Sequence, residues 1–137
     1  MGNSVSINKI NFEDVQEAVK NDYIIINTLQ YSNQNCLIGN TLPASVEVTK
    51  INLLISSNRK DSYIILYGEN STDNSVYSKY KQLSELGFDN IHIYIGGLFE
   101  WLLMQDIYGC VSFPTTKIEQ NHLQYKGNKK LHIKMIE

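Results

Sequence analysis

Three short apolar runs spaced along the chain constrain its fold more than any other feature. They occupy residues 23–27, 63–67 and 91–95, and each is continuous rather than alternating. Continuous runs rich in β-branched residues are typical of strands that are buried on both faces of a parallel sheet. Segments with helical spacing of apolar residues separate or follow these runs, at 44–55, 76–86 and from Gly97 onward. The alternation predicts an α/β domain with a central, mostly parallel sheet flanked by helices.

Weaker signals predict the remaining elements. Residues 6–10 suit a short edge strand, and Asn11 is placed to cap a helix over 12–20. Two apolar stretches around Gly127 and Asn128, at 123–125 and 131–136, predict a small C-terminal β-hairpin. We therefore expect a core over 1–109 and a β extension over 110–137 that packs on the same single domain.

Composition limits the classes of partner. The chain has 137 residues, of which 42% are hydrophobic and 19% charged, so we expect one packed core. A net charge of -2 gives no general attraction for nucleic acid, and no apolar run is long enough to span a membrane. The first residues lack a signal peptide, which favours an intracellular, cytoplasmic protein that is a monomer or weak dimer. Gly2 and Ser6 fit the loose N-myristoylation pattern, the alternative being an unmodified N-terminus.

The residues that usually bind metals are dispersed. The two cysteines, Cys36 and Cys110, form no Cys-x-x-Cys pair, and the three histidines are scattered along the chain. We therefore expect no metal, no cofactor and no disulfide. Cys36 follows the first central run, so it could lie near a site at the carboxyl edge of the sheet.

The loop after the second central run is the strongest candidate for a binding site, because ligands of open parallel sheets bind beyond the carboxyl ends of the strands. Its residues are small or polar and lead directly into a helix: Gly68, Glu69, Asn70, Ser71, Thr72 and Asp73. Backbone N–H groups ahead of a helix can bind an anion or a carboxylate. Glu69 and Asp73 would repel a phosphate unless they point away. The alternatives are a cationic group on a partner and a loop that only caps its helix.

The order of the motifs along the chain resembles the rhodanese-like domains. Residues 86–91 (Leu-Gly-Phe-Asp-Asn-Ile) and 96–101 (Gly-Gly-Leu-Phe-Glu-Trp) fit that family's Gly-Phe-x-x-Val and Gly-Gly-x-x-x-Trp motifs. The resemblance covers residues 5–106 and implies a three-layer rhodanese-like fold. Residues 102–109 and 113–116 are similar to a branch of such proteins in eukaryotes and their large DNA viruses. The residues that the resemblance places around the site are Asn27, Cys36, Gly96, Gly97 and Trp101, although Trp101 is also typical of core packing.

The departures from the family pattern decide what the resemblance implies for function. Sulfur transfer in the family passes through a persulfide on a cysteine that opens the loop, and Gly68 stands at that position. The related phosphatases need the same cysteine and an arginine at the end of the loop, where this chain has Asp73. Asn27 and Leu29 replace a charged Asp and Arg. The resemblance therefore implies a catalytically inactive, non-enzymatic module that binds an unidentified protein through its former active-site edge. The alternative is a sulfurtransferase-type enzyme that uses Cys36.

Overall fold

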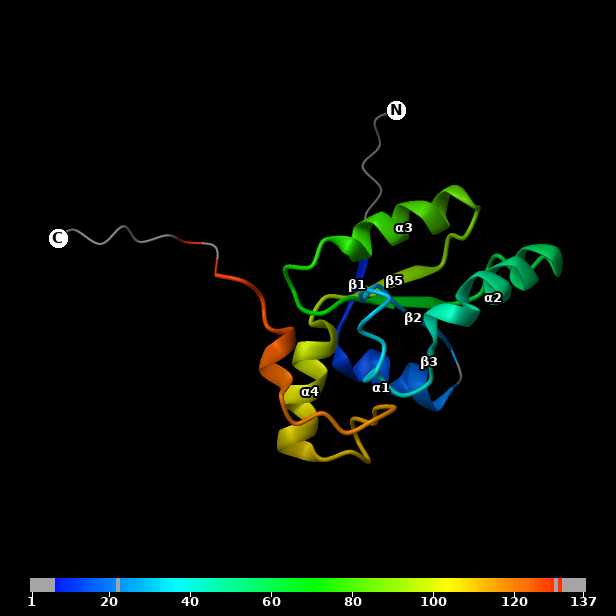
Figure 1. Cartoon of the computed structure of the whole chain (residues 1–137). Helices are drawn as coiled ribbons and strands as arrows, with labels where there is room; N and C mark the ends of the chain where they lie inside the picture. The colour runs from blue at the N-terminus through cyan, green and yellow to red at the C-terminus, as the bar shows by residue number, and fades with distance from the viewer. Residues whose placement is uncertain (1–6, 22, 130, 132–137) are drawn as a thin grey trace.

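The computed structural model describes residues 7–21, 23–129 and 131, and it confirms the α/β fold class (Figure 1). One five-stranded sheet has the order β1-β5-β4-β2-β3, and every pair of neighbouring strands is parallel. The elements in chain order are β1 (Asn8–Ile10), α1 (Phe12–Lys20), β2 (Ile24–Asn27), β3 (Thr41–Leu42), α2 (Ala44–Ser56), β4 (Ile64–Tyr67), α3 (Ser75–Glu85), β5 (Ile91–Tyr94), α4 (Gly97–Tyr108) and the 3-10 helix η1 (His122–Tyr125).

The three layers follow from the apolar character of the central strands. In β4, Ile64 and Leu66 pack into the hydrophobic cluster that also holds Ile51 of α2 and Leu83 of α3. The alternate residues of β4 point the other way, into the cluster that contains side chains of α1 and α4. Figure 1 shows α2 and α3 on one side of the sheet and α1 and α4 on the other. Because both faces are covered, a continuous apolar run is the pattern that the strand requires.

Strand register determines which loops meet at the carboxyl edge. Asn27 at the end of β2 pairs with Tyr67 at the end of β4, and Tyr67 pairs in turn with Tyr94 at the end of β5. The segments that follow these three residues therefore leave the sheet side by side, as expected for an open parallel sheet. This is the edge at which the sequence predicted a site.

The predicted C-terminal hairpin is wrong in its first strand. Leu123, Gln124 and Tyr125 lie in the 3-10 helix η1 rather than in a strand, and most of the second expected strand falls outside the described residues. Burial explains the difference. Tyr125 is 1% exposed because it packs with Leu98 and Trp101 in the cluster under α4, and one helical turn is enough to place a single side chain there. Phe113, also in the extension, lies in the same cluster.

Among the described residues, no helix combines the length and the apolar character that crossing a membrane requires.

Candidate functional site

The loop of residues 68–73 begins directly after the last residue of β4. Gly68 is buried, whereas Ser71 and Thr72 are exposed at the outer end of the loop. The structure thus places the six predicted loop residues together, with the first at the floor and the middle at the surface. What decides the chemistry of this loop is the group to which its backbone amides donate.

The carboxylate of Asp73 turns back into the loop and accepts hydrogen bonds there. The Glu69 N–H donates to Asp73 Oδ2 at 2.9 Å, and the Ser75 N–H donates to Asp73 Oδ1 at 3.0 Å. The Ser75 hydroxyl lies 2.7 Å from the same Oδ1 and donates to it, since an ionised carboxylate only accepts. The backbone N–H groups of the loop therefore bind a carboxylate, and that carboxylate belongs to the chain itself.

The pKa of Asp73 reflects this environment. Burial acts to raise the pKa of the carboxyl, but the hydrogen bonds from Glu69 and Ser75 outweigh burial and hold the pKa below its ordinary value. The neighbouring Glu69 shifts the other way, because burial and then the negative charge of Asp73 raise its pKa. An ionised Asp73 with a lowered pKa is a weak base, so it is poorly suited to general base catalysis.

The Asp73 carboxylate also occupies the room that a side chain at position 68 would need. A Cβ atom placed on Gly68 would lie 2.5 Å from Asp73 Oδ2 and 2.9 Å from Asp73 Cγ. Gly68 does not have a positive φ, so its backbone would accept any residue type. The obstacle to a side chain at position 68 is therefore steric and lies first in Asp73, with Thr28 Oγ1 at 3.1 Å as a second, less severe contact.

The glycine pair before α4 holds the loop in place from the other side. Gly97 has φ +70°, and a Cβ there would lie 2.7 Å from the carbonyl oxygen of Gly68 and 2.8 Å from the Asn70 nitrogen. Only glycine combines that conformation with that close approach. The N–H groups of Leu98 and Phe99 donate to the carbonyl oxygens of Gly68 and Glu69, at 2.9 and 2.8 Å. These N-terminal amides of α4 are therefore used to fix the loop.

The C-terminal extension contacts the outer part of the loop. The Asn70 side-chain amide donates to the carbonyl oxygen of Tyr125 at 2.8 Å. A Cβ on Gly127 would lie 3.0 Å from Thr72 Oγ1, so the chain after η1 passes directly over the loop. Residues on both sides of the loop thus restrain it.

The predicted supporting residue Asn27 forms a neutral amide pair. Asn27 is 4% exposed, donates to Gln34 Oε1 at 3.0 Å and accepts from Gln34 Nε2 at 2.8 Å. Its Oδ1 also accepts from the Leu29 N–H. The pair shapes the segment after β2 without a charge, where the family resemblance implied an Asp and Arg.

The two thiols are in opposite environments. Cys36 is 1% exposed, and its Sγ donates to the Lys117 carbonyl oxygen at 3.3 Å, beneath the C-terminal extension. Burial, followed by the charge of Glu119, raises the pKa of the Cys36 thiol, which disfavours the reactive thiolate. Cys110 is exposed and lies outside the loop region.

Trp101 belongs to the core rather than to a binding surface. Its ring is fully buried, packs edge-on against Phe113 at 4.9 Å between centroids, and donates from Nε1 to the Pro114 carbonyl oxygen. Gly96 directly precedes α4 and packs against the Glu100 side chain. Neither residue reaches the loop with a side chain of its own.

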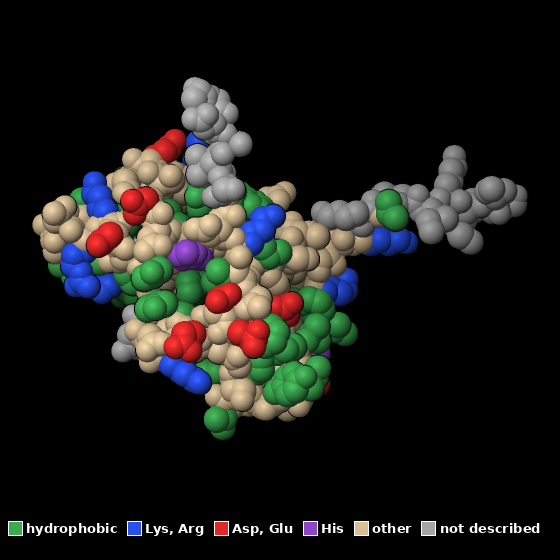
Figure 2. All heavy atoms as spheres, turned by 180° about the vertical axis from the view of Figure 1, so that it is seen from behind, with side chains coloured by type: hydrophobic (Ala, Val, Ile, Leu, Met, Phe, Trp, Pro, Cys, Tyr) green, Lys and Arg blue, Asp and Glu red, His purple; other side chains and the backbone are tan. Residues whose placement is uncertain are grey.

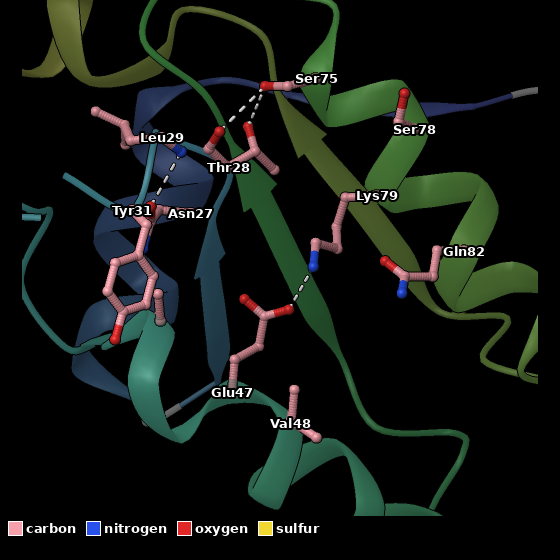
Figure 3. Close-up of a pocket in the computed structure, with 11 residues that line it drawn as sticks. Asn27, Thr28, Leu29, Tyr31, Glu47, Val48, Ser75, Ser78, Lys79 and Gln82 are labelled. Atoms are coloured by element: carbon pink, nitrogen blue, oxygen red, sulfur yellow. Dashed lines mark hydrogen bonds and ion pairs between the residues drawn. The ribbon is translucent and has the colours of Figure 1, made fainter. Parts of the chain in front are cut away.

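A groove runs between α2 and α3 beside the loop, and no feature of the sequence indicated it. A cavity of about 440 Å³ at the carboxyl edge shares four lining residues with a cavity of about 220 Å³ further along the helices: Glu47, Val48, Lys79 and Gln82. We call the two together the α2–α3 groove. Figure 3 shows Lys79 of α3 reaching toward Glu47 of α2, with which it forms an ion pair. Contacts between residues so far apart in sequence leave no local signal.

The groove is joined to the loop by hydroxyl groups. Thr28 and Ser75 line it, and their hydroxyl oxygens are 2.7 Å apart. Since the Ser75 hydroxyl donates to Asp73, Thr28 is the donor to Ser75, and a hydrogen-bond chain runs from the groove to the loop. The sequence did carry a local signal for the hydrogen bond from the Ser75 N–H to Asp73. An aspartate two residues before the first N–H of a helix commonly accepts from that N–H.

Among the residues that the structure describes, no group of three or more His, Cys, Asp or Glu side chains is arranged to hold a metal ion. The geometry of the site thus consists of a loop filled by its own carboxylate, a buried thiol under the extension, and an open groove alongside.

Comparison with known families fits this architecture. The profile of the rhodanese-like domain matches residues 24–104, which is more than half of the chain. The chain belongs to the rhodanese-like domain family. No curated protein matches the sequence significantly.

Solved structures of low sequence identity share the rhodanese-like fold. A protein from Anabaena sp. is 17% identical, with 84% of this chain and 97% of that chain covered and a TM-score of 0.52. A single-domain sulfurtransferase from Saccharomyces cerevisiae is 12% identical, with 77% and 97% covered and a TM-score of 0.53. A yeast protein tyrosine phosphatase of the rhodanese family is 14% identical, with 82% and 94% covered and a TM-score of 0.51. At these identities the likeness concerns the fold alone.

Proposed function

We propose that this rhodanese-like domain is catalytically inactive and binds a protein partner through the carboxyl edge of its sheet. One observation carries the first half of the proposal. The resemblance assigns the family's nucleophile position to Gly68, and the space for a side chain at this residue is filled by the Asp73 carboxylate. A thiolate beside that negative charge would be disfavoured even if a cysteine were present.

The environment of Cys36 argues against the alternative of a sulfurtransferase with a displaced nucleophile. A nucleophilic thiol needs exposure and a lowered pKa. Cys36 has neither, because the extension covers it and burial raises its pKa.

The α2–α3 groove supports the binding half of the proposal. It is open, lies next to the loop, and combines exposed apolar side chains such as Val48 with hydroxyl and amide groups. Protein interfaces commonly combine these two kinds of group, with apolar contacts at the centre and polar ones at the rim. The edge of the fold that carries sulfur chemistry in relatives would thus serve for contact alone.

Inactivity is tested by measuring thiocyanate formation from cyanide, with thiosulfate or mercaptopyruvate as sulfur donor. We expect the full chain to give no more product than a control without protein. The Cys36→Ser and Cys110→Ser variants should be indistinguishable from the wild type. Turnover that is present in the wild type and lost only in Cys36→Ser would instead establish the displaced-nucleophile enzyme.

Binding through the groove is tested by capturing proteins from extract of the native host cell on immobilised domain. Val48→Arg places a long charged side chain in the groove, and Val111→Arg is its matched control, since both valines are exposed, at 68% and 99%. We expect a protein that is retained by the wild type and by Val111→Arg but not by Val48→Arg. Equal retention of every captured protein by both variants would contradict the assignment of the groove.

A further inference from the structure

On the α1 side of the sheet, a cavity of about 220 Å³ lies among residues that neither the loop nor the groove uses. Tyr23 and Tyr63, which line it, directly precede β2 and β4, whereas the loop of residues 68–73 follows β4. The cavity is therefore separate from the proposed binding edge, and what it binds does not depend on the proposed function.

Three aromatic rings that stack in a row line this cavity, and both faces of the middle ring, Tyr63, are covered by its neighbours. Tyr23 stacks on Tyr63 with centroids 5.0 Å apart and planes 15° from parallel, and Tyr63 stacks on His92 at 5.7 Å and 23°. Tyr23 and Tyr63 are 37% and 49% exposed. Side chains of Ile10 and Ile65 complete the apolar lining. An exposed aromatic wall beside a cavity is a feature of ligand sites, since it leaves a large apolar surface in contact with water.

Two carboxylates from α1 line the same cavity. Asp14 and Glu17 are three residues apart, so they lie on one face of the helix. Asp14 Oδ2 accepts from the Asn11 N–H, and Glu17 Oε1 accepts from the Asn21 side-chain amide. In residues 7–21, 23–129 and 131, the second oxygen of each carboxylate has no hydrogen-bond donor, and neither group is in an ion pair.

Neither lysine nor arginine is among the residues that line the cavity. Figure 2 shows a face of the molecule on which a histidine side chain lies beside hydrophobic ones, with a Lys or Arg side chain to one side and several carboxylates close by. The cavity therefore offers an aromatic wall and negative charge together, a combination that attracts organic cations.

We infer that this cavity binds a guanidinium group, presented as an arginine side chain of a partner protein. A guanidinium is planar and only weakly hydrated, so it packs against aromatic rings, and its several N–H donors can serve two carboxylates at once. An ammonium group is not planar, and its N–H donors are not spread widely enough to serve two separate carboxylates. An arginine within a chain suits the site better than the free amino acid, whose own carboxylate would be repelled by Asp14 and Glu17.

The test is a titration of isotope-labelled full chain with N-acetyl-arginine amide, followed by amide chemical shifts. N-acetyl-citrulline amide is the neutral probe of nearly the same shape. Free arginine tests whether the guanidinium group could come from the free amino acid instead of from a protein chain. We expect saturable shifts at residues 14–17, 23, 63 and 92 with the acetylated arginine, weaker ones with free arginine and none with the citrulline probe. Equal shifts with the citrulline probe, or shifts confined to other residues, would overturn the inference.

Charge removal supplies the matched variants. Asp14→Asn with Glu17→Gln keeps the size and the hydrogen-bond acceptors but removes both charges, and Glu13→Gln on the same helix is the control outside the cavity. We expect the double variant to weaken binding of the acetylated arginine by about three- to tenfold, the effect of losing exposed ion pairs, and the control to leave it unchanged. Equal affinity in the double variant would overturn the inference, and Glu17→Gln alone gives the same decision if the double variant does not fold.

Discussion

Asp73 determines the character of the loop of residues 68–73 through one carboxylate. Its hydrogen bonds to the Glu69 and Ser75 amides give the loop an internal anion, and its position denies room to a side chain at residue 68. The resemblance predicted that the loop lacks a nucleophile, because Gly68 has no side chain. A local pattern indicated that Asp73 accepts from the Ser75 N–H, but nothing in the sequence indicated its second hydrogen bond, from Glu69, or its closeness to Gly68.

The lowered pKa of Asp73 predicts how stability depends on pH. A carboxyl whose pKa is lower in the folded chain than in the unfolded one stabilises the fold at pH values above its unfolded pKa of about 3.9. That contribution is lost as the pH falls through the lowered native value. We therefore expect the difference in unfolding free energy between the wild type and Asp73→Asn to shrink below about pH 4.

The measurement is urea unfolding at a series of pH values for both proteins. The difference between the two proteins removes the contributions of groups that do not interact with Asp73. Glu69 does interact with it, because the charge of Asp73 helps to raise the Glu69 pKa, and this coupling has the opposite pH dependence. A difference that stays constant, or that grows in acid, would show that the Asp73 carboxylate is not held by the loop.

At the scale of elements, the sequence predicted what depends on local pattern. The central strands, α1 with its Asn11 cap, and α3 ending before Gly87 all follow from apolar period and capping residues. The structure of the C-terminal extension could not be predicted in this way, since it depends on contacts with residues far away in the sequence. The Gly39 N–H donates to the Pro114 carbonyl oxygen, and the Thr116 N–H donates to that of Leu37. Such pairings cannot be inferred from the neighbours of either residue.

The cover that the extension gives to Cys36 predicts a difference in thiol reactivity. Because Cys36 is buried with a raised pKa and Cys110 is exposed, iodoacetamide should modify Cys110 in the native protein and leave Cys36 largely unmodified. Both should react once the chain is unfolded in denaturant. Peptide mass spectrometry gives the extent at each site. Rapid native labelling of Cys36 would mean that the extension does not cover it.

At the scale of the whole molecule, the extension is part of one hydrophobic core. Phe113 is 3% exposed and contacts the rings of Phe12, Trp101 and Tyr108. Of these three residues only Trp101 lies inside the family match, since Phe12 precedes it and Tyr108 follows it. The family match ends at residue 104 and does not include Phe113. The stability of the domain should therefore depend on residues that the family pattern does not include.

Truncation of Phe113 tests that dependence. Phe113→Ala should lower the unfolding free energy by about 3–5 kcal/mol, the usual cost of removing a buried phenylalanine. Val111→Ala, two residues away and 99% exposed, should change it by less than about 0.5 kcal/mol. Chemical denaturation of the three proteins gives both values. Similar small effects for the two variants would mean that the extension packs loosely on an independent core.

The central claim, that the Asp73 carboxylate fills the place of a nucleophile at position 68, is tested most directly by adding a methyl group there. In a double-mutant cycle of unfolding free energies, Gly68→Ala should cost the wild type about 1–3 kcal/mol, because the new Cβ meets the carboxylate. In an Asp73→Ala background only the Thr28 Oγ1 contact at 3.1 Å remains, so the cost of the same change should be smaller by about 0.5–3 kcal/mol. If Gly68→Ala instead stabilises the protein while Asp73 is present, or has the same effect in both backgrounds, the Asp73 carboxylate does not fill the space at Gly68 and the account is contradicted.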